Sequence, residues 1–473
     1  MTEPLWQWDE LITAAGAGAE GTPAGIVTGF SIDTRTLAAG NVFVALKAER
    51  DGHDFVPAAF AAGAAAALVS HDYVRAAGDG ALLRVADPLA ALEAIGSAAR
   101  TRSNARIVAV TGSAGKTGSK EMLRLCLGDA GATHASEKSY NNHWGVPLTL
   151  ARMPAGTEYG VLEIGMNHAG EITPLTHLVR PHVAVITTVE PVHLGYFGSV
   201  EAIAEAKAEI FAGLVPGGTA VLPYDNPYFG LLRERASTVG ARIVTFGYAE
   251  AADVRCVQAN MDARGSSVIA GIGSQRFPYR IGAPGEHYIK NSLAVLAALR
   301  ALGADPMRCL PALVKAAAPA GRGARSVLET QDGEVLLIDE SYNANPASVR
   351  AALSAMATVP RADFPRRIVV LGDMLELGDA ANDLHRGLKE PVDATGVDLV
   401  FACGPMMRLF FDGLKPAQQG AWAADSSELA PRLLEAVKAG DVVMIKGSLG
   451  SRMGPLAEAV RTRFSKAGGA RPK

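Results

Sequence analysis

The sequence lacks the features of several protein classes. It has only four cysteines among 473 residues, and no two of them form a Cys-x-x-Cys pair. A disulfide framework or a zinc site is therefore not expected, and the composition fits a reducing, cytoplasmic compartment. The net charge is −3, without the basic excess that marks a nucleic-acid-binding surface. We expect a cytoplasmic protein without a nucleic-acid partner.

Long hydrophobic runs are also missing. The N-terminal stretch has no basic segment followed by an apolar run, so a signal peptide is not predicted. The most apolar stretch, 58–69, is mostly alanine and is shorter than the about 20 residues that a membrane-spanning helix needs. We interpret it as a buried alanine-rich helix that leads into a strand, and we expect no membrane insertion.

Short β-branched runs recur along the chain, each followed by glycine or a loop and then a helical pattern. The first series is 106–112, 159–165, 183–189, 219–223 and 242–247, and the second is 335–341, 367–373, 399–404 and 442–448. Continuous apolar strands that alternate with helices are typical of parallel sheets covered on both faces. The sequence therefore predicts an α/β fold with two such sheets.

Domain boundaries follow from the composition around these series. A region with shorter strands precedes the first series, and a Pro-, Gly- and Ala-rich stretch typical of a hinge, 316–326, separates the two. A single core rarely grows beyond about 250–300 residues. We expect a small α/β domain at 1–103, a central domain at 104–319 and a C-terminal domain at 320–473.

A phosphate-binding loop is the strongest local signal. The stretch after the strand at 106–110 contains Gly112, Ser113, Ala114, Gly115, Lys116 and Thr117, and a helical pattern follows it. Glycines let backbone N–H groups point at phosphate, and the helix N-terminus adds a positive dipole. Lys116 would neutralise the β- and γ-phosphates of a nucleotide, and the Thr117 hydroxyl would bind Mg²⁺. The alternative is a glycine-rich turn with a surface lysine.

Three further residues are candidates for a metal site. Glu163 ends a predicted strand, where ligands of parallel sheets bind, and a carboxylate there suits Mg²⁺; alone it would more often form an ion pair. His193 also follows a strand end, but a lone histidine is more often structural. Lys207 lies on a helical run beside Glu205 and Glu209, and the residues alone favour ordinary ion pairs, because an ammonium cannot bind a cation.

These residues belong to a longer series of motifs. The series comprises SIDTR (31–35), DGHDF (51–55), TGSAGKT (111–117), NNHWGVPLTL (141–150), EIGMNHAGEI (163–172), HLGYFGSVEAIAEAKAEIF (193–211), PGEHYIKN (284–291), GRG (321–323), DESYNANP (339–346), LGDMLELG (371–378) and KGSLGSRM (446–453). Over nearly the whole chain, and in the same order, the sequence resembles the Mur ligases of bacterial peptidoglycan synthesis and their folylpolyglutamate synthase relatives. The resemblance implies a three-domain architecture: a small N-terminal α/β domain, a central P-loop ATPase domain with a parallel sheet, and a Rossmann-like C-terminal domain.

The resemblance also implies an activity: ATP-dependent formation of an amide bond through an acyl phosphate. The implied partners are UDP-N-acetylmuramoyl-tripeptide as donor and D-alanyl-D-alanine as acceptor, with ATP and two Mg²⁺ ions as cofactors and a monomeric enzyme. The motifs at 341–346, 371–378 and 446–453 are similar to those of the dipeptide-adding members. Open alternatives are a P-loop kinase or NTPase switch, a nucleotide sensor, and a sister ligase with another amine acceptor.

Residue roles follow by the same resemblance. For the nucleotide and the metals, Lys116 and Arg322 would bind phosphate, Thr117 and Glu163 one Mg²⁺, and His193 and a carbamylated Lys207 a second Mg²⁺. Asn291 would recognise adenine, and the nucleotide site would be completed by Asp339, Tyr342, Asn343 and Asn345. For the substrates, the muramoyl peptide would contact Asn141 and Asn142, the UDP part would contact Ser31, Asp33, Thr34 and Arg35, and the acceptor's carboxylate would bind Lys446 or Arg452.

Simpler interpretations of some of these residues stay open. Asn141 and Asn142 are also typical of a helix cap, and 343–346 and 321–323 are also typical of turns. Lys446 and Arg452 are equally well interpreted as surface cations.

Overall fold

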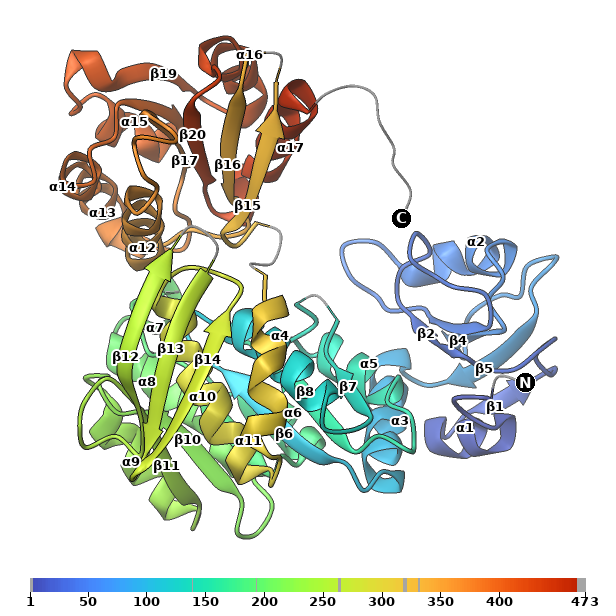
Figure 1. Ribbon diagram of the computed structural model, residues 1–473. Coiled ribbons are helices and arrows are strands. Elements are labelled where there is room, and N and C mark those ends of the chain that lie inside the picture. The colour runs from blue at the N-terminus through green and yellow to red at the C-terminus, as the bar shows by residue number, and fades with distance from the viewer. Residues whose placement is uncertain are drawn as a thin grey trace.

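The computed structural model describes residues 3–137, 139–192, 194–262, 265–317, 321–330 and 332–465. Three sheets of five, nine and six strands follow one another along the chain, and helices cover them. Figure 1 shows the N-terminal sheet at the right, the central sheet at the lower left and the C-terminal sheet above it. The predicted α/β fold is confirmed, and every strand of the two predicted series is present.

The N-terminal sheet has the order β1-β5-β4-β3-β2, with β1 antiparallel and the others parallel. Its strands are β1 (Gly18–Glu20), β2 (Gly29–Ser31), β3 (Asn41–Val44), β4 (Ala66–Ser70) and β5 (Ala81–Val85). Its helices are α1 (Trp8–Ala15), η1 (Gly52–Phe55), α2 (Val56–Ala61) and α3 (Pro88–Arg102). The alanine-rich stretch does form a helix followed by a strand, but α2 buries only Val56 and Ala59, because it covers the sheet with one face.

The central sheet has the order β14-β13-β12-β11-β10-β9-β6-β8-β7. Its strands are β6 (Arg106–Thr111), β7 (Thr133–Ala135), β8 (Tyr159–Glu163), β9 (Val183–Ile186), β10 (Thr219–Pro223), β11 (Arg242–Gly247), β12 (Val254–Asp262), β13 (Gly265–Ile272) and β14 (Gln275–Ile281). Its helices are α4 (Lys116–Gly128), α5 (Gly145–Ala151), α6 (Ile172–Val179), α7 (Leu194–Phe197), α8 (Val200–Ala208), η2 (Glu209–Gly213), α9 (Phe229–Thr238), α10 (Glu286–Ala301), α11 (Pro306–Cys309) and η3 (Leu310–Lys315).

Strand β6 shows how this sheet is buried on both faces. Val108 and Val110 belong to the core beneath α4 and α10, whereas Ile107 and Ala109 belong to the core on the opposite face. The strands β12, β13 and β14 add an antiparallel extension that the sequence analysis did not predict. The reason is that β12 is largely exposed and mixes polar with apolar residues, so it lacks the continuous apolar run of a buried parallel strand.

The C-terminal sheet has the order β15-β16-β20-β17-β18-β19, and only β15 is antiparallel. Its strands are β15 (Ala324–Glu329), β16 (Glu334–Glu340), β17 (Arg366–Gly372), β18 (Leu399–Cys403), β19 (Gln419–Ala423) and β20 (Asp441–Lys446). Its helices are α12 (Pro346–Ala357), η4 (Gly378–Ala380), α13 (Ala381–Arg386), α14 (Lys389–Ala394), α15 (Pro405–Phe411), η5 (Pro416–Gln418), α16 (Ser426–Ala436), η6 (Leu449–Ser451) and α17 (Met453–Phe464). In the part of the chain that the structure describes, no helix combines the length and the apolarity that crossing a membrane requires.

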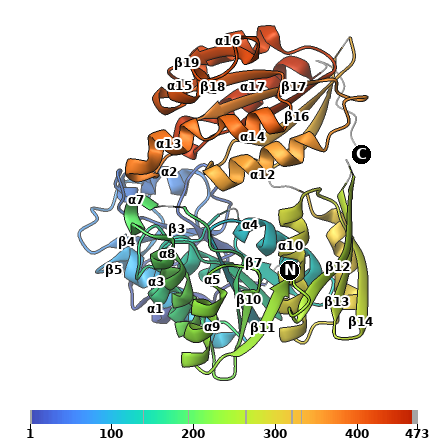
Figure 2. The ribbon, with the colours of Figure 1, turned by 90° about the vertical axis from the view of Figure 1, so that its left-hand side faces the viewer.

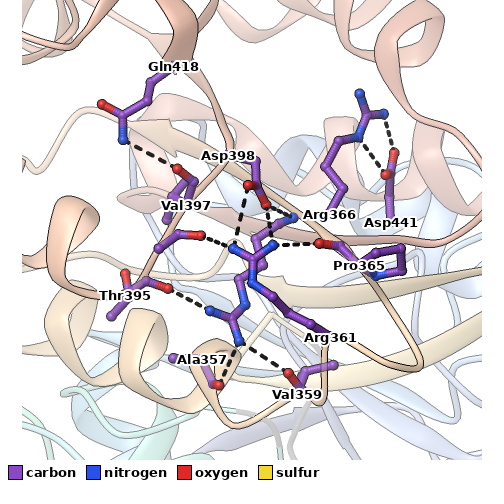
Figure 3. Close-up of polar contacts among 12 residues, drawn as sticks. Ala357, Val359, Arg361, Pro365, Arg366, Thr395, Val397, Asp398, Gln418 and Asp441 are labelled. Carbon is purple, nitrogen blue, oxygen red and sulfur yellow. Dashed lines mark hydrogen bonds and ion pairs between the residues drawn. The ribbon is translucent and has the colours of Figure 1, made fainter.

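Ion pairs hold the amino-terminal edge of the C-terminal sheet (Figure 3). Arg366, at the start of β17, pairs with Asp441, at the start of β20, at 2.6 Å. Arg361 pairs with Asp398 just before β18, and the Arg367 guanidinium donates to main-chain carbonyls of the neighbouring loops. Ligands of parallel sheets bind at the carboxyl ends of the strands, so these contacts serve stability at the opposite edge.

Side chains also fix the N-terminal sheet against the central one. The indole N–H of Trp6 donates to the carbonyl of Ala151 at 2.9 Å. In the other direction, the Arg152 guanidinium donates to the carbonyl of Phe30 at 2.8 Å. Both bonds join the N-terminal region to the carboxyl end of α5, and the second places β2 against that end.

Candidate active site

The phosphate loop connects β6 to α4, and its glycines are required by geometry. Gly112 and Gly115 have φ values of 150° and 82°, which L side chains rarely adopt. A Cβ at Gly112 would overlap the Thr187 hydroxyl, and one at Gly115 would lie 2.7 Å from the Asn291 amide. Backbone N–H groups at the start of α4 are therefore open to an anion.

Lys116 begins α4 and curls back over the loop. Its ammonium donates a 2.6 Å hydrogen bond to the carbonyl of Gly112. Burial lowers the pKa of Lys116; nearby Glu163 opposes this shift, and Arg322 adds to it. A phosphate in the loop would restore the stability of the charged amine, as the predicted role requires.

Glu163 ends β8 beside the phosphate loop. Its oxygen Oε1 accepts bonds from the Thr117 hydroxyl at 3.3 Å and from the Asn141 amide at 2.7 Å. Its other oxygen, Oε2, is buried and has no hydrogen-bond partner among the described residues. A buried carboxylate oxygen without a donor, next to a hydroxyl, fits the oxygen ligands that Mg²⁺ prefers.

The protein offers few metal ligands of its own. The described ranges contain no group of three His, Cys, Asp or Glu side chains that could hold a metal. Mg²⁺ is usually bound by one or two carboxylates together with substrate phosphates, so Glu163 and Thr117 fit one such ion. His193, predicted for a second ion, lies outside the described residues.

Lys207 is not the ion-paired surface lysine that the residues alone favoured. It lies on α8 and is 2% exposed. Its two acidic neighbours bind elsewhere: Glu205 pairs with Arg235, and Glu209 accepts from the Thr173 hydroxyl. Burial, and then the charge of Lys116, hold the pKa of Lys207 well below its usual range. Burial therefore favours the neutral form of this amine.

A cavity of about 300 Å³ lies between the central and the C-terminal domains. Figure 2 shows α12 on the side of the C-terminal domain that faces the central domain, and residues of α12 line this cavity. The predicted site residues that line it are Ser113, Ala114, Gly115, Asn291, Arg322, Asn343, Asn345 and Lys446. The fold thus brings together much of the predicted nucleotide site from both domains.

Arg322 occupies a defined position in this cavity. Its guanidinium lies over the Tyr342 ring, 4.1 Å from the ring centroid, and its carbonyl accepts a 3.3 Å bond from the Tyr288 hydroxyl. Two aromatic residues, one from each domain, therefore hold Arg322.

Two predicted nucleotide residues are engaged in local structure. Asp339 accepts from the Ser341 hydroxyl at 2.6 Å and does not line the cavity. Its neighbour Glu340 does line it, because successive strand residues point to opposite faces. The Asn345 side chain accepts from the N–H of Ser348 at 2.8 Å and is the N-cap of α12, so it has a structural role that the sequence analysis did not assign to it.

Lys446 and Arg452 are placed differently. Lys446 is 2% exposed and donates to Glu340 Oε2 at 3.2 Å and to the carbonyl of Asn343 at 2.9 Å. The surface-cation interpretation is therefore wrong for Lys446. Arg452 is exposed and has a φ of 51°, in the turn between η6 and α17.

A larger cleft, of about 1020 Å³, is lined by residues of all three domains. They include Glu93 of α3, Asn141 and Asn142 of the central domain, and Tyr342 and Leu449 of the C-terminal domain. The Asn142 side chain also accepts from two backbone N–H groups at the start of α5, so the cap interpretation is confirmed for its oxygen. Asn141 thus lines this cleft and also contacts the buried carboxylate of Glu163.

The predicted UDP contacts lie at the carboxyl end of β2 and line neither cavity. Ser31 donates to the carbonyl of Asp33, and the Asp33 carboxylate pairs with Arg35 at 2.6 Å. The Arg35 side chain is 87% exposed. Thr34 stands between the two paired residues on this accessible turn.

The sequence analysis missed the loop that supports the phosphate loop from behind. The Thr187 hydroxyl donates to the carbonyl of Ala114 at 2.5 Å, and the Ser113 hydroxyl donates to the carbonyl of Glu190 at 3.0 Å. The usable signal was a polar segment at the carboxyl end of β9, the strand beside β6.

The fold and the site define a nucleotide-dependent enzyme in which a P-loop domain faces a second α/β domain that contributes an arginine. Two family models match the chain: the Mur ligase middle domain over residues 110–299, and the Mur ligase, glutamate ligase domain over residues 325–449. The chain belongs to the Mur ligase family and is an ATP-dependent ligase.

Individual relatives agree with this assignment over nearly their whole length. The UDP-N-acetylmuramoyl-tripeptide–D-alanyl-D-alanine ligase of Escherichia coli is 34% identical over 97% of both chains. The crystal structure of MurF from Acinetobacter baumannii matches with a TM-score of 0.82 at 29% identity, over 97% of this chain and 99% of that one. MurF from Thermotoga maritima in complex with ADP matches with a TM-score of 0.75 at 26% identity, over 93% and 98%.

Proposed function

We propose that this enzyme joins D-alanyl-D-alanine to UDP-N-acetylmuramoyl-tripeptide at the expense of ATP. The product is the UDP-muramoyl-pentapeptide of peptidoglycan synthesis, and the enzyme acts as a cytoplasmic monomer. The observation that carries the proposal is the cleft shared by three domains, because one of its lining residues, Asn141, bonds to Glu163 beside the phosphate loop. A donor and an acceptor that enter from different domains would meet ATP there.

The domains then have separate tasks. We assign residues 1–103 to the UDP part of the donor, 104–319 to ATP, and 320–473 to the acceptor and to the closure over ATP. The exposed turn at 31–35 supports the first assignment, and the phosphate loop supports the second. Arg322 and Asn343 in the nucleotide cavity, with Leu449 in the larger cleft, support the third.

The chemistry follows from the weak reactivity of a free carboxylate toward amines. The donor carboxylate attacks the γ-phosphorus of ATP and displaces ADP, which leaves an acyl phosphate. The amine of the dipeptide attacks its carbonyl, and phosphate leaves from the tetrahedral intermediate with loss of one proton from nitrogen. Lys116 and Arg322 offset the negative charge that gathers when ATP meets a carboxylate.

Mg²⁺, held by Glu163 and Thr117, would supply further positive charge to the phosphate oxygens. For a second ion we propose His193 and a carbamylated Lys207. Only a neutral amine attacks CO₂, and burial lowers the pKa of Lys207, which favours the neutral form. The resulting carbamate is an anionic oxygen ligand, which removes the objection that an ammonium cannot bind a cation.

The test is ADP release with a panel of acceptors, namely D-alanyl-D-alanine, D-Glu, L-Lys and meso-diaminopimelate, each with its matching UDP-muramoyl precursor. We expect fast turnover with the dipeptide and dependence on both substrates. Faster turnover with a single amino acid would assign a sister activity. ADP release without any amine would instead point to a kinase or a switch.

A further inference from the structure

Two exposed leucines lie on neighbouring turns at the carboxyl edge of the C-terminal sheet. Leu375 follows β17 and is 45% exposed, and Leu449 follows β20 and is 66% exposed. The Leu375 N–H donates to the Ser448 hydroxyl at 2.9 Å, and the Ser448 N–H donates to the carbonyl of Asp373 at 3.1 Å. A Cβ on Gly450 would lie 2.7 Å from the Leu375 side chain. The two turns therefore form one apolar surface.

The backbone of both turns is strained. Only three non-glycine residues among the described ranges have positive φ, and two of them, Glu376 and Arg452, lie on these turns. Non-glycine residues hold such conformations where the surrounding structure demands them, and they cluster at ligand clamps. The strain and the exposed leucines are independent observations, and both fall on the same edge.

Part of this surface, at Leu449, lines the three-domain cleft. Leu449 lines it together with Tyr342 of the same domain and with Asn141 across it. The Asn141 amide contacts the buried Glu163, so the cleft extends from a residue bonded to Glu163 to the turn that carries Leu449. An acceptor whose amine attacks near Glu163 would have the rest of its length directed toward Leu449.

The acceptor's carboxylate also needs a cation. Lys446 is engaged with Glu340 and with the carbonyl of Asn343, and it lines the nucleotide cavity instead. Arg452 lies three residues after Leu449, is exposed, and forms no ion pair with any described residue. It also precedes the first turn of α17, where the helix dipole favours an anion.

On this geometry we propose that Leu375 and Leu449 bind the methyl groups of the acceptor dipeptide and that Arg452 binds its terminal carboxylate. The inference rests on the proposed function and identifies its specificity-determining residues. A single amino acid with a polar side chain would leave the leucines uncovered, whereas a dipeptide with two methyl groups covers them and still reaches Arg452.

The leucines are tested by steady-state kinetics of Leu375→Ala and Leu449→Ala with each substrate varied in turn. Contact between one methyl group and an apolar pocket changes kcat/KM by at least about tenfold. We expect the KM for D-alanyl-D-alanine to rise about tenfold and the preference over glycylglycine to fall by a similar factor. The KM values for ATP and the donor should stay unchanged. Met406→Ala, which removes a 38% exposed side chain of α15, is the matched control.

Arg452 is tested by comparing the dipeptide with its C-terminal amide. The parent enzyme should use the amide about tenfold less efficiently, and Arg452→Gln should use the two equally well. Arg432→Gln, an exposed arginine on α16, should behave as the parent enzyme does.

The outcomes separate the two levels of the proposal. If the parent enzyme uses D-alanyl-D-alanine but the leucine variants keep its KM and its preference over glycylglycine, the leucine subsite is wrong and the proposed function stands. An Arg452→Gln enzyme that still discriminates against the amide would overturn the role of Arg452. If the parent enzyme prefers a different amine, the proposed function fails together with this inference.

Discussion

The side-chain amide of Asn141 donates a 2.7 Å hydrogen bond to the Oε1 oxygen of Glu163. The two residues come from different elements, the segment before α5 and the end of β8. This bond and the Thr117 hydroxyl occupy Oε1 and leave the buried Oε2 without a partner among the described residues. Asn141 therefore orients a carboxylate whose other oxygen is available to a cation.

Glu163→Gln should abolish the Mg²⁺ dependence of this site. The amide cannot supply the anionic oxygen, and the loss of several kcal/mol of charge stabilisation corresponds to a fall of about 10²–10³-fold in turnover. The measurement is ADP release as a function of Mg²⁺ concentration. Glu435→Gln, an exposed residue of α16, serves as the control. Full activity of a folded Glu163→Gln enzyme would contradict the metal assignment.

Lys116→Met should eliminate turnover while the protein stays folded. Methionine keeps the length and apolar stem of the side chain but removes the ammonium, which lies over the phosphate loop and which we propose binds the γ-phosphate. We expect a loss of at least about 10³-fold in kcat, measured by ADP release, with an unchanged thermal unfolding midpoint. A folded variant with the kinetics of the parent enzyme would contradict the P-loop assignment.

Lys207→Arg should lose activity, because a guanidinium does not form the carbamate. The parent enzyme should lose activity in CO₂-free buffer and regain it with bicarbonate. ¹³C NMR with labelled CO₂ should show one carbamate resonance that is absent from the variant. The carbamate proposal fails if Lys207→Arg turns over like the parent.

His182 should make stability pH-dependent in the mildly acidic range. Burial, and then the charges of Arg100 and Arg106, lower the pKa of His182 in the folded state. Its Nδ1 accepts the N–H of Ile107, so the folded protein requires the neutral ring. Below the ordinary pKa of about 6.5 the unfolded chain binds the proton more readily. The contribution of His182 to the free energy of unfolding is thus fully present above the ordinary pKa. It is lost as the pH drops toward the lowered pKa of the folded state.

The check is the thermal unfolding midpoint at about pH 7.5 and about pH 5.5. His182→Asn keeps an acceptor for Ile107 but does not titrate, so its midpoint should fall less. Burial also lowers the pKa of His134 and His287, so the unfolding midpoint of His182→Asn should still decrease somewhat at the lower pH. An identical decrease in parent and variant would refute the assignment to His182.

Arg366→Met should destabilise the C-terminal domain without changing the active site. It leaves the 3% exposed carboxylate of Asp441 without its bidentate partner (Figure 3). We expect a loss of about 2 kcal/mol in the free energy of unfolding, below the full cost of an unpaired buried charge, since Arg366 is itself one-third exposed. The double variant Arg366→Met/Asp441→Leu should recover much of the lost free energy of unfolding. Denaturant unfolding measures the loss, and unchanged KM values would show that it is confined to stability.

The strand series, the phosphate loop and the hinge composition could all be predicted from the sequence, because each is a local pattern. Apolar runs specify buried parallel strands, and glycines at Gly112 and Gly115 specify backbone conformations that other residues avoid. The antiparallel strands β12, β13 and β14 were not predicted, because their half-exposed residues carry no comparable local signal.

Which side chains meet depends on how distant segments pack. The burial of Lys207, and with it the lowered pKa of its amine, depends on how α8 packs on the core and not on its acidic neighbours in the sequence. The alternation of strand β16 places Glu340 rather than Asp339 at the nucleotide cavity. Lys446 and Arg452 are six residues apart, yet one is buried against Glu340 and the other is exposed. Burial and strand direction are set by contacts between distant segments, so a local pattern can nominate these residues but cannot assign their partners.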